Sequence, residues 1–385
     1  MSAALSILKA VHQTPRLSRA QLTRSTSLGA STVSLHVKQL LDSGVLREIG
    51  TRQNPLGRPS ILLEINPEFA YVVGAYHDQR SLTGVIASFS GDIVARSVKH
   101  LDDTTPDAFV KAAAALVAAL VEDSGVPARR VAGVGIAMSG LIDGESGTCI
   151  NSTVLGWRDV PLASLLADRI RYPVVLENDA NAMAVASHYF GLARGHASHC
   201  IVALGEGLGG GIYLGGELVR GTMGVVAEVG HLTVDPAGPL CACGKRGCVE
   251  ALASARALRQ VAQEHGWPVA TLAGVRVLGV AGDVVAADAH ARATNALGLA
   301  ISHVVNLLCP EQIVIIDKGV GLDAASEHAI SRAVEECTMP MIPAVPTIAF
   351  ETATDDAWAL GAASLSMHAL LEGRWSTVED LMMTT

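Results

Sequence analysis

A histidine and three cysteines lie close together in the second half of the chain. The segment GHLTVDPAGPLCACGKRGC spans residues 230–248, and its three cysteines fall within eight positions. Three thiolates and one imidazole make a complete tetrahedral ligand set for zinc, and two glycines let so short a loop wrap an ion. A closed site leaves no position for a reactive water, so we expect a structural zinc and no zinc-catalysed hydrolysis. The predicted ligands are His231, Cys241, Cys243 and Cys248.

A group of free thiols is the alternative explanation of this cluster. Lys245 and Arg246 stand beside the thiolates and would offset their surplus negative charge. The chain has seven cysteines, an odd number that does not suit the paired disulfides of a secreted protein. Because a cytosolic protein seldom keeps three such thiols together without a metal, zinc is the favoured interpretation.

The length and composition indicate two or three domains and a cytoplasmic location. With 385 residues, half of them hydrophobic, the chain is too long for one compact core and too apolar for disorder. Its apolar runs are all shorter than the roughly 18 residues of a membrane span. The first residues lack the layout of a secretory signal, so we expect no membrane partner.

Charge is spread unevenly along the chain. Residues 1–66 hold eight Lys or Arg against three Asp or Glu, a net charge of +5, so the overall charge of −9 leaves −14 on residues 67–385. A small basic segment joined to a large acidic body suggests that the segment meets a polyanion. A merely solvated basic face is the alternative.

The pattern of residues 1–43 predicts three short helices. The first covers Ala3–Val11, the second Arg19–Thr26 with Ser18 as its N-cap, and the third Ser31–Ser43 after a tight turn. This order is that of a helix-turn-helix, whose last helix enters the major groove of DNA. An interaction module built from the same three helices is the alternative.

The third helix and the hairpin after it carry the candidate DNA contacts. Apolar residues at helical spacing (Val33, Val37, Leu40 and Leu41) predict a buried face, which leaves short polar side chains on the other. We expect a hairpin over 49–65 with a wing-like tip at 50–59, whose arginines would reach phosphates or a narrow minor groove. The candidate DNA-binding residues are Ser31, Thr32, Ser34, His36, Lys38, Arg52 and Arg58.

Residues 67–385 alternate apolar runs of strand length with amphipathic helices, which is typical of an α/β body with covered sheets. We expect a three-strand meander at 71–98, a buried strand at Val131–Met138 and the longest helix at Ala289–Leu308. A succession of sheet, helix and sheet occurs twice in outline, which suggests two similar lobes with a cleft between them.

A second polar constellation, ENDAN, follows the apolar strand Val174–Leu176 directly. A carboxylate at a strand end is placed to accept a hydrogen bond from a ligand hydroxyl, and Asp179 could act as a general base. A pure N-capping role of Asp179 on the helix 180–189 is equally compatible with the sequence. Glu228 and Glu250 flank the predicted zinc loop, which would hold their carboxylates rigidly.

These motifs together resemble the ROK family of repressors, open reading frames and sugar kinases. The resemblance rests on GVGIAMSGLID at 133–143, NSTVLGWRDVPLASLL at 151–166, ENDANAMA at 177–184, LGEGLGGGI at 204–212, EVGH at 228–231 and CACGKRGCVE at 241–250. It covers essentially the whole chain and implies an actin-like, ribonuclease-H-like body of two lobes after the winged helix. By the family pattern, the residues that hold or line a sugar are Gly140, Asn151, Asn178, Asp179, Glu228, His231 and Glu250. In the family's kinases the residue at Asp179 takes the proton from the hydroxyl that is phosphorylated.

The sequence departs from the family's kinases at their phosphate loops. The kinases carry Asp-x-Gly-Gly-Thr after the first strand, where this chain has Tyr76 in place of the acid and Asp78 and Gln79 in place of the glycines. Glu206 stands where the kinases have Thr, and Asp317-Lys318 replaces a Gly-Gly pair that admits adenosine. Like charges about 4 Å apart repel by about 1 kcal/mol even in water, so ATP should bind poorly.

The sequence therefore predicts a sugar-responsive transcriptional regulator, a repressor in type, without kinase activity. It would bind operator DNA as a homodimer or homotetramer and a sugar or sugar phosphate in its body. The expected domains are a winged helix at 1–66, a first lobe at 67–176 with 362–385, and a second lobe at 177–361. A ROK sugar kinase with an atypical ATP site and a scaffold for a protein partner are the alternatives.

Overall fold

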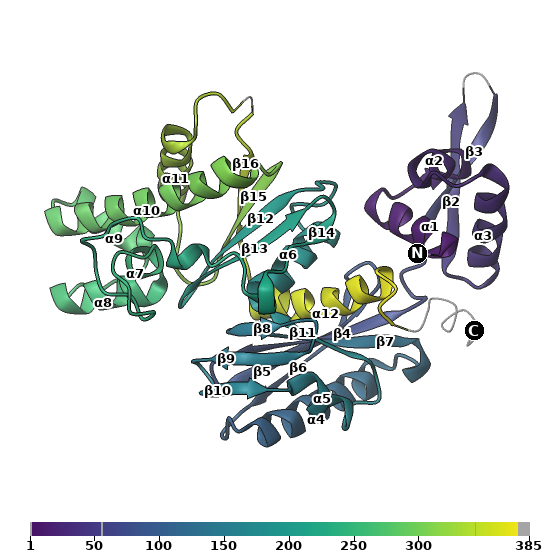
Figure 1. Ribbon diagram of the computed structural model, residues 1–385, viewed down its shortest axis with the longest axis horizontal. Coiled ribbons are helices and arrows are strands. Elements are labelled where there is room, and N and C mark those ends of the chain that lie inside the picture. Colours follow the sequence, from purple (N-terminus) through teal and green to yellow (C-terminus); the bar gives the residue numbers. More distant parts are fainter. Residues whose placement is uncertain (1, 55–56, 343, 376–385) are drawn as a thin grey trace. The chain divides into compact units, whose positions relative to one another are not determined.

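The computed structural model describes residues 2–54, 57–342 and 344–375 (Figure 1). The chain divides into two compact units, one of residues 1–195 with 355–385 and the other of residues 196–354. Among the described residues, no helix has the length and apolar character required to span a bilayer.

The N-terminal part of the first unit is a winged helix-turn-helix. Its elements are α1 (Ala3–Gln13), β1 (Leu17–Ser18), α2 (Arg19–Thr26), α3 (Ala30–Asp42), β2 (Leu46–Asn54) and β3 (Gly57–Ile65), with the strands in the order β1-β3-β2. The three predicted helices are confirmed, and α2 begins and ends where the sequence placed it. Ser18 is its N-cap, and the Ser18 backbone N–H donates to Gln21 Oε1 at 3.0 Å.

The hairpin differs from its prediction at the tip. Strand pairing continues to Asn54 and resumes at Gly57, so most of the predicted tip at 50–59 belongs to β2 and β3, with register shifts between Glu48 and Thr51 and between Arg52 and Asn54. Arg52 pairs in register with Ser60 and is exposed. The turn at 55–56 and the side chain of Arg58 lie outside the described residues.

The rest of the first unit is built on a five-stranded sheet in the order β11-β7-β4-β5-β6. Its strands are β4 (Tyr71–Asp78), β5 (Ser81–Ser88), β6 (Ile93–His100), β7 (Val131–Met138) and β11 (Val174–Asn178), and the predicted meander is the antiparallel part β4-β5-β6. A three-stranded sheet is formed by β8 (Leu141–Asp143), β9 (Thr148–Ser152) and β10 (Trp157–Val160). The helical elements are α4 (Pro106–Ser124), η1 (Ala128–Arg130), α5 (Leu162–Ala167), α6 (Asp179–Tyr189) and α12 (Asp355–Leu371). One core of apolar side chains joins α4 and α5 to this sheet.

Two glycines let α12 lie against the sheet, as Figure 1 shows. Gly74 of β4 and Gly135 of β7 are partners in the parallel pairing. A Cβ atom at Gly74 would lie 2.0 Å from the Ala359 carbonyl oxygen, and one at Gly135 would lie 1.8 Å from that of Ala362. Both distances are far below van der Waals contact, so the backbone of α12 occupies the space that side chains would need.

The second unit repeats this plan. Its sheet has the order β14-β13-β12-β15-β16, from β12 (His199–Leu204), β13 (Leu208–Leu214), β14 (Glu217–Leu218), β15 (Gln312–Asp317) and β16 (Thr347–Thr352). In both sheets an antiparallel meander is followed by two parallel strands, which confirms the prediction of two similar α/β lobes. The helical elements are η2 (Thr222–Gly224), η3 (Val229–His231), α7 (Glu250–Ala253), α8 (Ala255–His265), α9 (Leu272–Val280), α10 (Val284–Leu308) and α11 (Ala324–Cys337).

The expected lobe boundaries at 177 and 361 differ from this division. The first unit extends to Gly195 and takes up the chain again at Asp355, so it contains the winged helix, α6 and all of α12. The physical reason is packing: α6 contacts α12 and the sheet strands β7 and β11, and α12 contacts β4, β5 and β7. The end of the β11 strand therefore does not coincide with a change of lobe.

Candidate functional site

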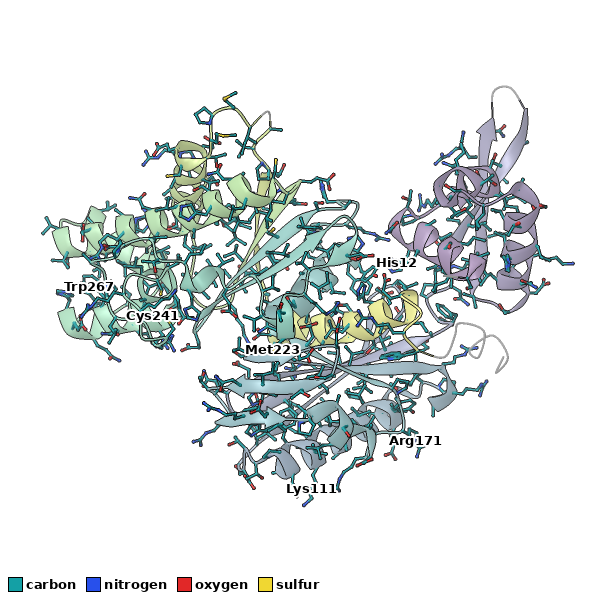
Figure 2. The ribbon with its side chains drawn as sticks, viewed as in Figure 1. His12, Lys111, Arg171, Met223, Cys241 and Trp267 are labelled. Carbon is teal, nitrogen blue, oxygen red and sulfur yellow. The ribbon has the colours of Figure 1, made fainter. Side chains whose placement is uncertain are left out.

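The histidine and three cysteines of the predicted zinc loop come together in the second unit. One ligand atom from each of the four residues lies within 4.8 Å of the others. The Sγ atoms of Cys243 and Cys248 are 3.7 Å apart, and Cys241 Sγ is 3.6 Å from His231 Nδ1. Zinc–sulfur bonds of about 2.3 Å at tetrahedral angles separate two sulfurs by about 3.8 Å, so these residues fit a four-coordinate zinc ion. Cys241 is labelled in Figure 2.

The backbone of the loop is held by its own basic residues. Lys245 Nζ donates to the His231 carbonyl oxygen at 2.8 Å, and Arg246 Nη1 donates to the Gly238 oxygen at 3.3 Å. The backbone N–H of Lys245, helped by its ammonium group, lowers the pKa of the Cys243 thiol. Gly247 has a φ of +66°, and a Cβ there would lie 1.5 Å from the Asp235 carbonyl oxygen, so only glycine fits.

Three of the predicted sugar residues surround this loop. His231 presents Nδ1 to Cys241, while its Nε2 is 4.0 Å from Glu228 Oε2, so its two nitrogens serve different neighbours. Glu250 is buried, with Oε1 on Arg256 Nη2 at 2.6 Å and Oε2 accepting from the Leu208 backbone N–H at 3.1 Å. Glu250 thus joins the zinc loop to the glycine-rich turn before β13.

The other four predicted sugar residues gather in the first unit, at the ends of β7, β9 and β11. Asn178 Nδ2 donates to the Gly140 carbonyl oxygen at 3.0 Å. Gly140 has a φ of +136°, and a Cβ there would lie 2.6 Å from the Asn151 carbonyl oxygen. Asp179 follows Asn178 directly and opens α6. The strand ends therefore present Gly140, Asn151, Asn178 and Asp179 together.

The N-cap of α6 is Asn178. Its Oδ1 accepts from the backbone N–H groups of Ala180 and Asn181 at 2.9 and 3.4 Å. Asp179 is the first residue inside the helix, where its carboxylate also favours the positive end of the helix dipole. The Asp179 Oδ1 atom also accepts from the Ala180 N–H at 2.9 Å, so both Asn178 and Asp179 contribute to the start of α6.

An aromatic pair occupies the position of the first phosphate loop. Tyr76, which replaces the acidic residue, stacks on Trp358 of α12 with ring centroids 5.4 Å apart and an interplanar angle of 29°. Both rings are buried. Burial, with the negative charges of Asp179, Asp78 and Asp355, raises the pKa of the Tyr76 phenol, so it stays protonated. Gln79 keeps a φ of +49°, a conformation that glycine adopts more easily.

Glu206, in the second phosphate loop, is paired with a residue that the sequence did not connect to it. Arg259 of α8 binds both carboxylate oxygens of Glu206, with Nη1 to Oε1 at 2.8 Å. The guanidinium group of Arg259 therefore opposes the negative charge of Glu206. What stands at this position is a bidentate ion pair that adds bulk to the loop.

The carboxylate of Asp317 accepts hydrogen bonds from the backbone of the turn after β15. Its two carboxylate oxygens accept from the N–H groups of Gly319, Val320, Gly321 and Leu322 at 2.8–3.2 Å. A curved run of backbone N–H groups is the usual cradle for a phosphate or another anion. Here the chain supplies the anion itself, and the side chain is buried. A hint in the sequence is an Asp directly before Lys-Gly-Val-Gly, since Asp side chains often accept from nearby turn amides.

The polar face of α3 is open to solvent in this chain. Val33, Val37 and Leu40 are buried as predicted, whereas Leu41 is only partly buried. Of the candidate DNA residues on this helix, Ser31, Ser34 and Lys38 are exposed, and Thr32 and His36 are half-buried. The helix thus has one face in the core and a polar face available for contact.

Comparisons with known proteins agree with this organisation. Residues 81–369 match the ROK family, and residues 4–47 match the winged helix-turn-helix DNA-binding family. The xylose repressor of Bacillus subtilis strain 168 is 29% identical over 309 residues, 80% of each protein. A glucokinase of Thermotoga maritima is 36% identical over 250 residues, 60% of this chain and 78% of the glucokinase.

A solved structure shares the fold along the whole chain. A ROK family transcriptional regulator, described as a homologue of the E. coli MLC protein, aligns with a TM-score of 0.80 at 22% identity. The alignment covers 99% of this chain and 98% of the other. The family match spans both α/β lobes and follows a winged helix-turn-helix, and on these grounds the chain belongs to the ROK family.

Proposed function

We propose that the protein is a sugar-responsive transcriptional repressor that binds operator DNA through its winged helix and a sugar through its ROK body. One observation carries this proposal: polar residues of the sugar pattern come together at strand ends, while the turn after β15 is filled by the Asp317 carboxylate. The similarity to the xylose repressor over 80% of both chains supports the same function. The effector is a sugar or a sugar phosphate.

The sugar would be held by the residues that the family pattern marks. Asp179 and the acids beside the zinc loop accept hydrogen bonds from sugar hydroxyls, and the amides of Asn151 and Asn178 both donate and accept. Gly140 lets this turn pack closely against Asn151, because a Cβ there would lie 2.6 Å from the Asn151 carbonyl oxygen. The proposed residues are Gly140, Asn151, Asn178, Asp179, Glu228, His231 and Glu250.

Zinc would hold the loop that carries the second half of this set. His231, Cys241, Cys243 and Cys248 have the chemistry and spacing for a structural ion. When bound, the ion supplies no reactive water, since all four positions are taken by protein ligands. His231 would then bind zinc through Nδ1 and leave Nε2 for Glu228 or a hydroxyl.

DNA would be read by α3 and the wing of a homodimer or homotetramer, since paired half-sites require two winged helices. Ser31, Thr32, Ser34, His36 and Lys38 belong to the face of α3 that would enter the groove, and Arg52 and Arg58 to the wing. The sugar changes operator affinity only if it binds the two states of the protein unequally.

Two substitutions should separate the two binding functions. Asp179→Asn is expected to keep DNA binding and to weaken sugar binding about 10- to 100-fold, because a hydrogen bond to a charged group is worth about 1.5–3 kcal/mol. Lys38→Ala is expected to keep sugar binding and to weaken DNA binding at every sequence. Calorimetry with D-xylose and D-glucose measures the first, and fluorescence anisotropy on a duplex selected from a random pool measures the second.

Matched surface variants serve as controls for this experiment. Asp168→Asn and Lys111→Ala remove the same charges from exposed positions in the first unit and should leave both affinities unchanged. The proposed function is refuted if the wild-type protein selects no duplex from the random pool, or if it binds no sugar.

Kinase activity is the second candidate, because Asp179 is retained and the glucokinase of Thermotoga maritima is 36% identical. We expect the rate of sugar-dependent ADP release with Mg-ATP to be at least about 1,000-fold below the 1–100 per second that is typical of kinases. A coupled assay over D-glucose and D-xylose measures this. Turnover that Asp179→Asn abolishes would establish the kinase instead.

A further inference from the structure

The last turn of α1 brings a buried histidine against the body of the first unit. His12, labelled in Figure 2, is 7% exposed, and its ring meets Tyr189 edge to face with centroids 4.8 Å apart. Phe89 and Phe190 complete the surroundings at 6.0 and 6.2 Å. Burial, reinforced by the positive charge of Arg194 and by His188, lowers the pKa of His12 to about 4, so the ring is neutral near pH 7. The DNA-binding domain thus inserts an uncharged aromatic ring into the body.

Tyr189 is the last residue of α6, the helix that Asp179 opens. Eleven residues at 1.5 Å each make α6 about 16 Å long. Every residue of this helix from Ala180 to Tyr189 is buried, which is unusual for a helix in a globular protein. One end of α6 therefore belongs to the proposed sugar site, and the other touches the DNA-binding domain.

The far end of α6 is fastened to α12. The Tyr189 hydroxyl and His368 Nδ1 are 2.9 Å apart, within hydrogen-bond distance. Along the same contact, a Cβ at Gly361 would lie 2.9 Å from Met183 Sδ, so the two helices approach closely. Just after α12, Glu372 forms an ion pair with Lys9 of α1 at 2.6 Å. The pair α6 and α12 thus reaches α1 at two points.

We propose that α6 transmits sugar binding to the DNA-binding domain, with the contact between His12 and Tyr189 as the junction. A close-packed interior does not deform gradually, so a shift at Asn178 and Asp179 moves a fully buried helix as a unit. The shift displaces Tyr189 against His12. Because α1 packs on α3, the displacement changes the position of the DNA-reading helix. This inference rests on the proposed function, since it requires an effector at the start of α6.

The test compares sugar-dependent DNA affinity in the wild-type chain and four variants. The probes are D-xylose or D-glucose, whichever binds by calorimetry, and the duplex selected from a random pool. In the wild type we expect the sugar to change DNA affinity by about 5- to 150-fold, the usual range of allosteric coupling. His12→Ala should reduce this change to less than about twofold, while sugar affinity without DNA and DNA affinity without sugar stay within about twofold of wild type. Tyr189→Phe, which keeps the ring and loses the bond to His368, should give an intermediate change.

Two further variants keep the test decisive. Gln13→Ala alters the exposed neighbour of His12 on the same helix and should retain the full change. His12→Phe restores a ring against Tyr189 and should recover most of the coupling, and it replaces His12→Ala if thermal melting shows that the alanine variant is unfolded.

The possible failures are distinguishable. If the wild type responds to sugar and both His12→Ala and Tyr189→Phe respond equally well, the proposed junction is wrong and the proposed function stands. If His12→Ala loses DNA binding without sugar, the contact is structural and the inference also fails. A wild type that binds sugar without any change in DNA affinity overturns both the inference and the proposed function.

Discussion

Replacing Cys243 by serine is expected to remove zinc from the loop and to destabilise the second unit by at least about 3 kcal/mol. Structural zinc contributes about 10–16 kcal/mol of binding free energy in zinc-finger peptides, and a site with three ligands left loses much of it. For a domain of this size the loss corresponds to a melting temperature about 6–12 °C lower. Because the loop carries Glu228, His231 and Glu250, sugar binding should fall with it. Elemental analysis, thermal melting and calorimetry on one preparation measure the three effects.

Cys337→Ser is the matched control, since Cys337 is exposed in the same unit at the end of α11 and lies outside the ligand group. It should keep the zinc content and the melting temperature of the wild type. The wild-type protein, purified without chelators, should contain about one zinc per chain, and a much lower content would contradict the ligand assignment. So would a Cys243→Ser variant that retains its zinc.

Gly135→Ala should destabilise the first unit by about 3 kcal/mol or more. Overpacking a core costs about 1–3 kcal/mol when side chains can yield. Here the new methyl group would lie 1.8 Å from the Ala362 carbonyl oxygen. Neither the backbone of β7 nor that of α12 can move away without separating the helix from the sheet. Urea unfolding monitored by circular dichroism gives the change in the free energy of unfolding.

Gly84→Ala provides the comparison within the same sheet. A Cβ at Gly84 of β5 would meet the side-chain methyl groups of Leu116 and Leu120 at 2.8 and 2.9 Å, and these can turn away. Its cost should be clearly smaller, at most about 1–2 kcal/mol. Equal losses for the two variants would show that α12 is not held against the sheet as described.

Local patterns in the sequence predicted the three helices of the winged helix-turn-helix, several strands of the body and the cysteine loop. The strand Val131–Met138 and the helix Arg19–Thr26 were placed to the residue, because each is bounded by residues with strong local preferences. The cysteine loop is likewise a local feature, since its ligands lie within 18 positions of one another and glycines permit the turn.

Contacts between distant segments could not be predicted in this way. Tyr76 and Trp358 stack although 282 positions separate them, and Arg259 reaches Glu206 across 53. The division of the chain differs from the expected lobe boundary at 177 for the same reason, because α6 packs on α12, which lies near the other end of the chain. Periodicity and residue spacing do not predict which buried surfaces of distant segments pack against each other.

The carboxylate of Asp317 has a consequence for how such a protein would behave in a growing cell. A turn whose backbone N–H groups already donate to a carboxylate of the chain offers little binding energy to the phosphate groups of ATP. The repressor we propose would therefore report the supply of carbohydrate independently of the energy charge of the cell. A kinase of the same fold, by contrast, depends on both.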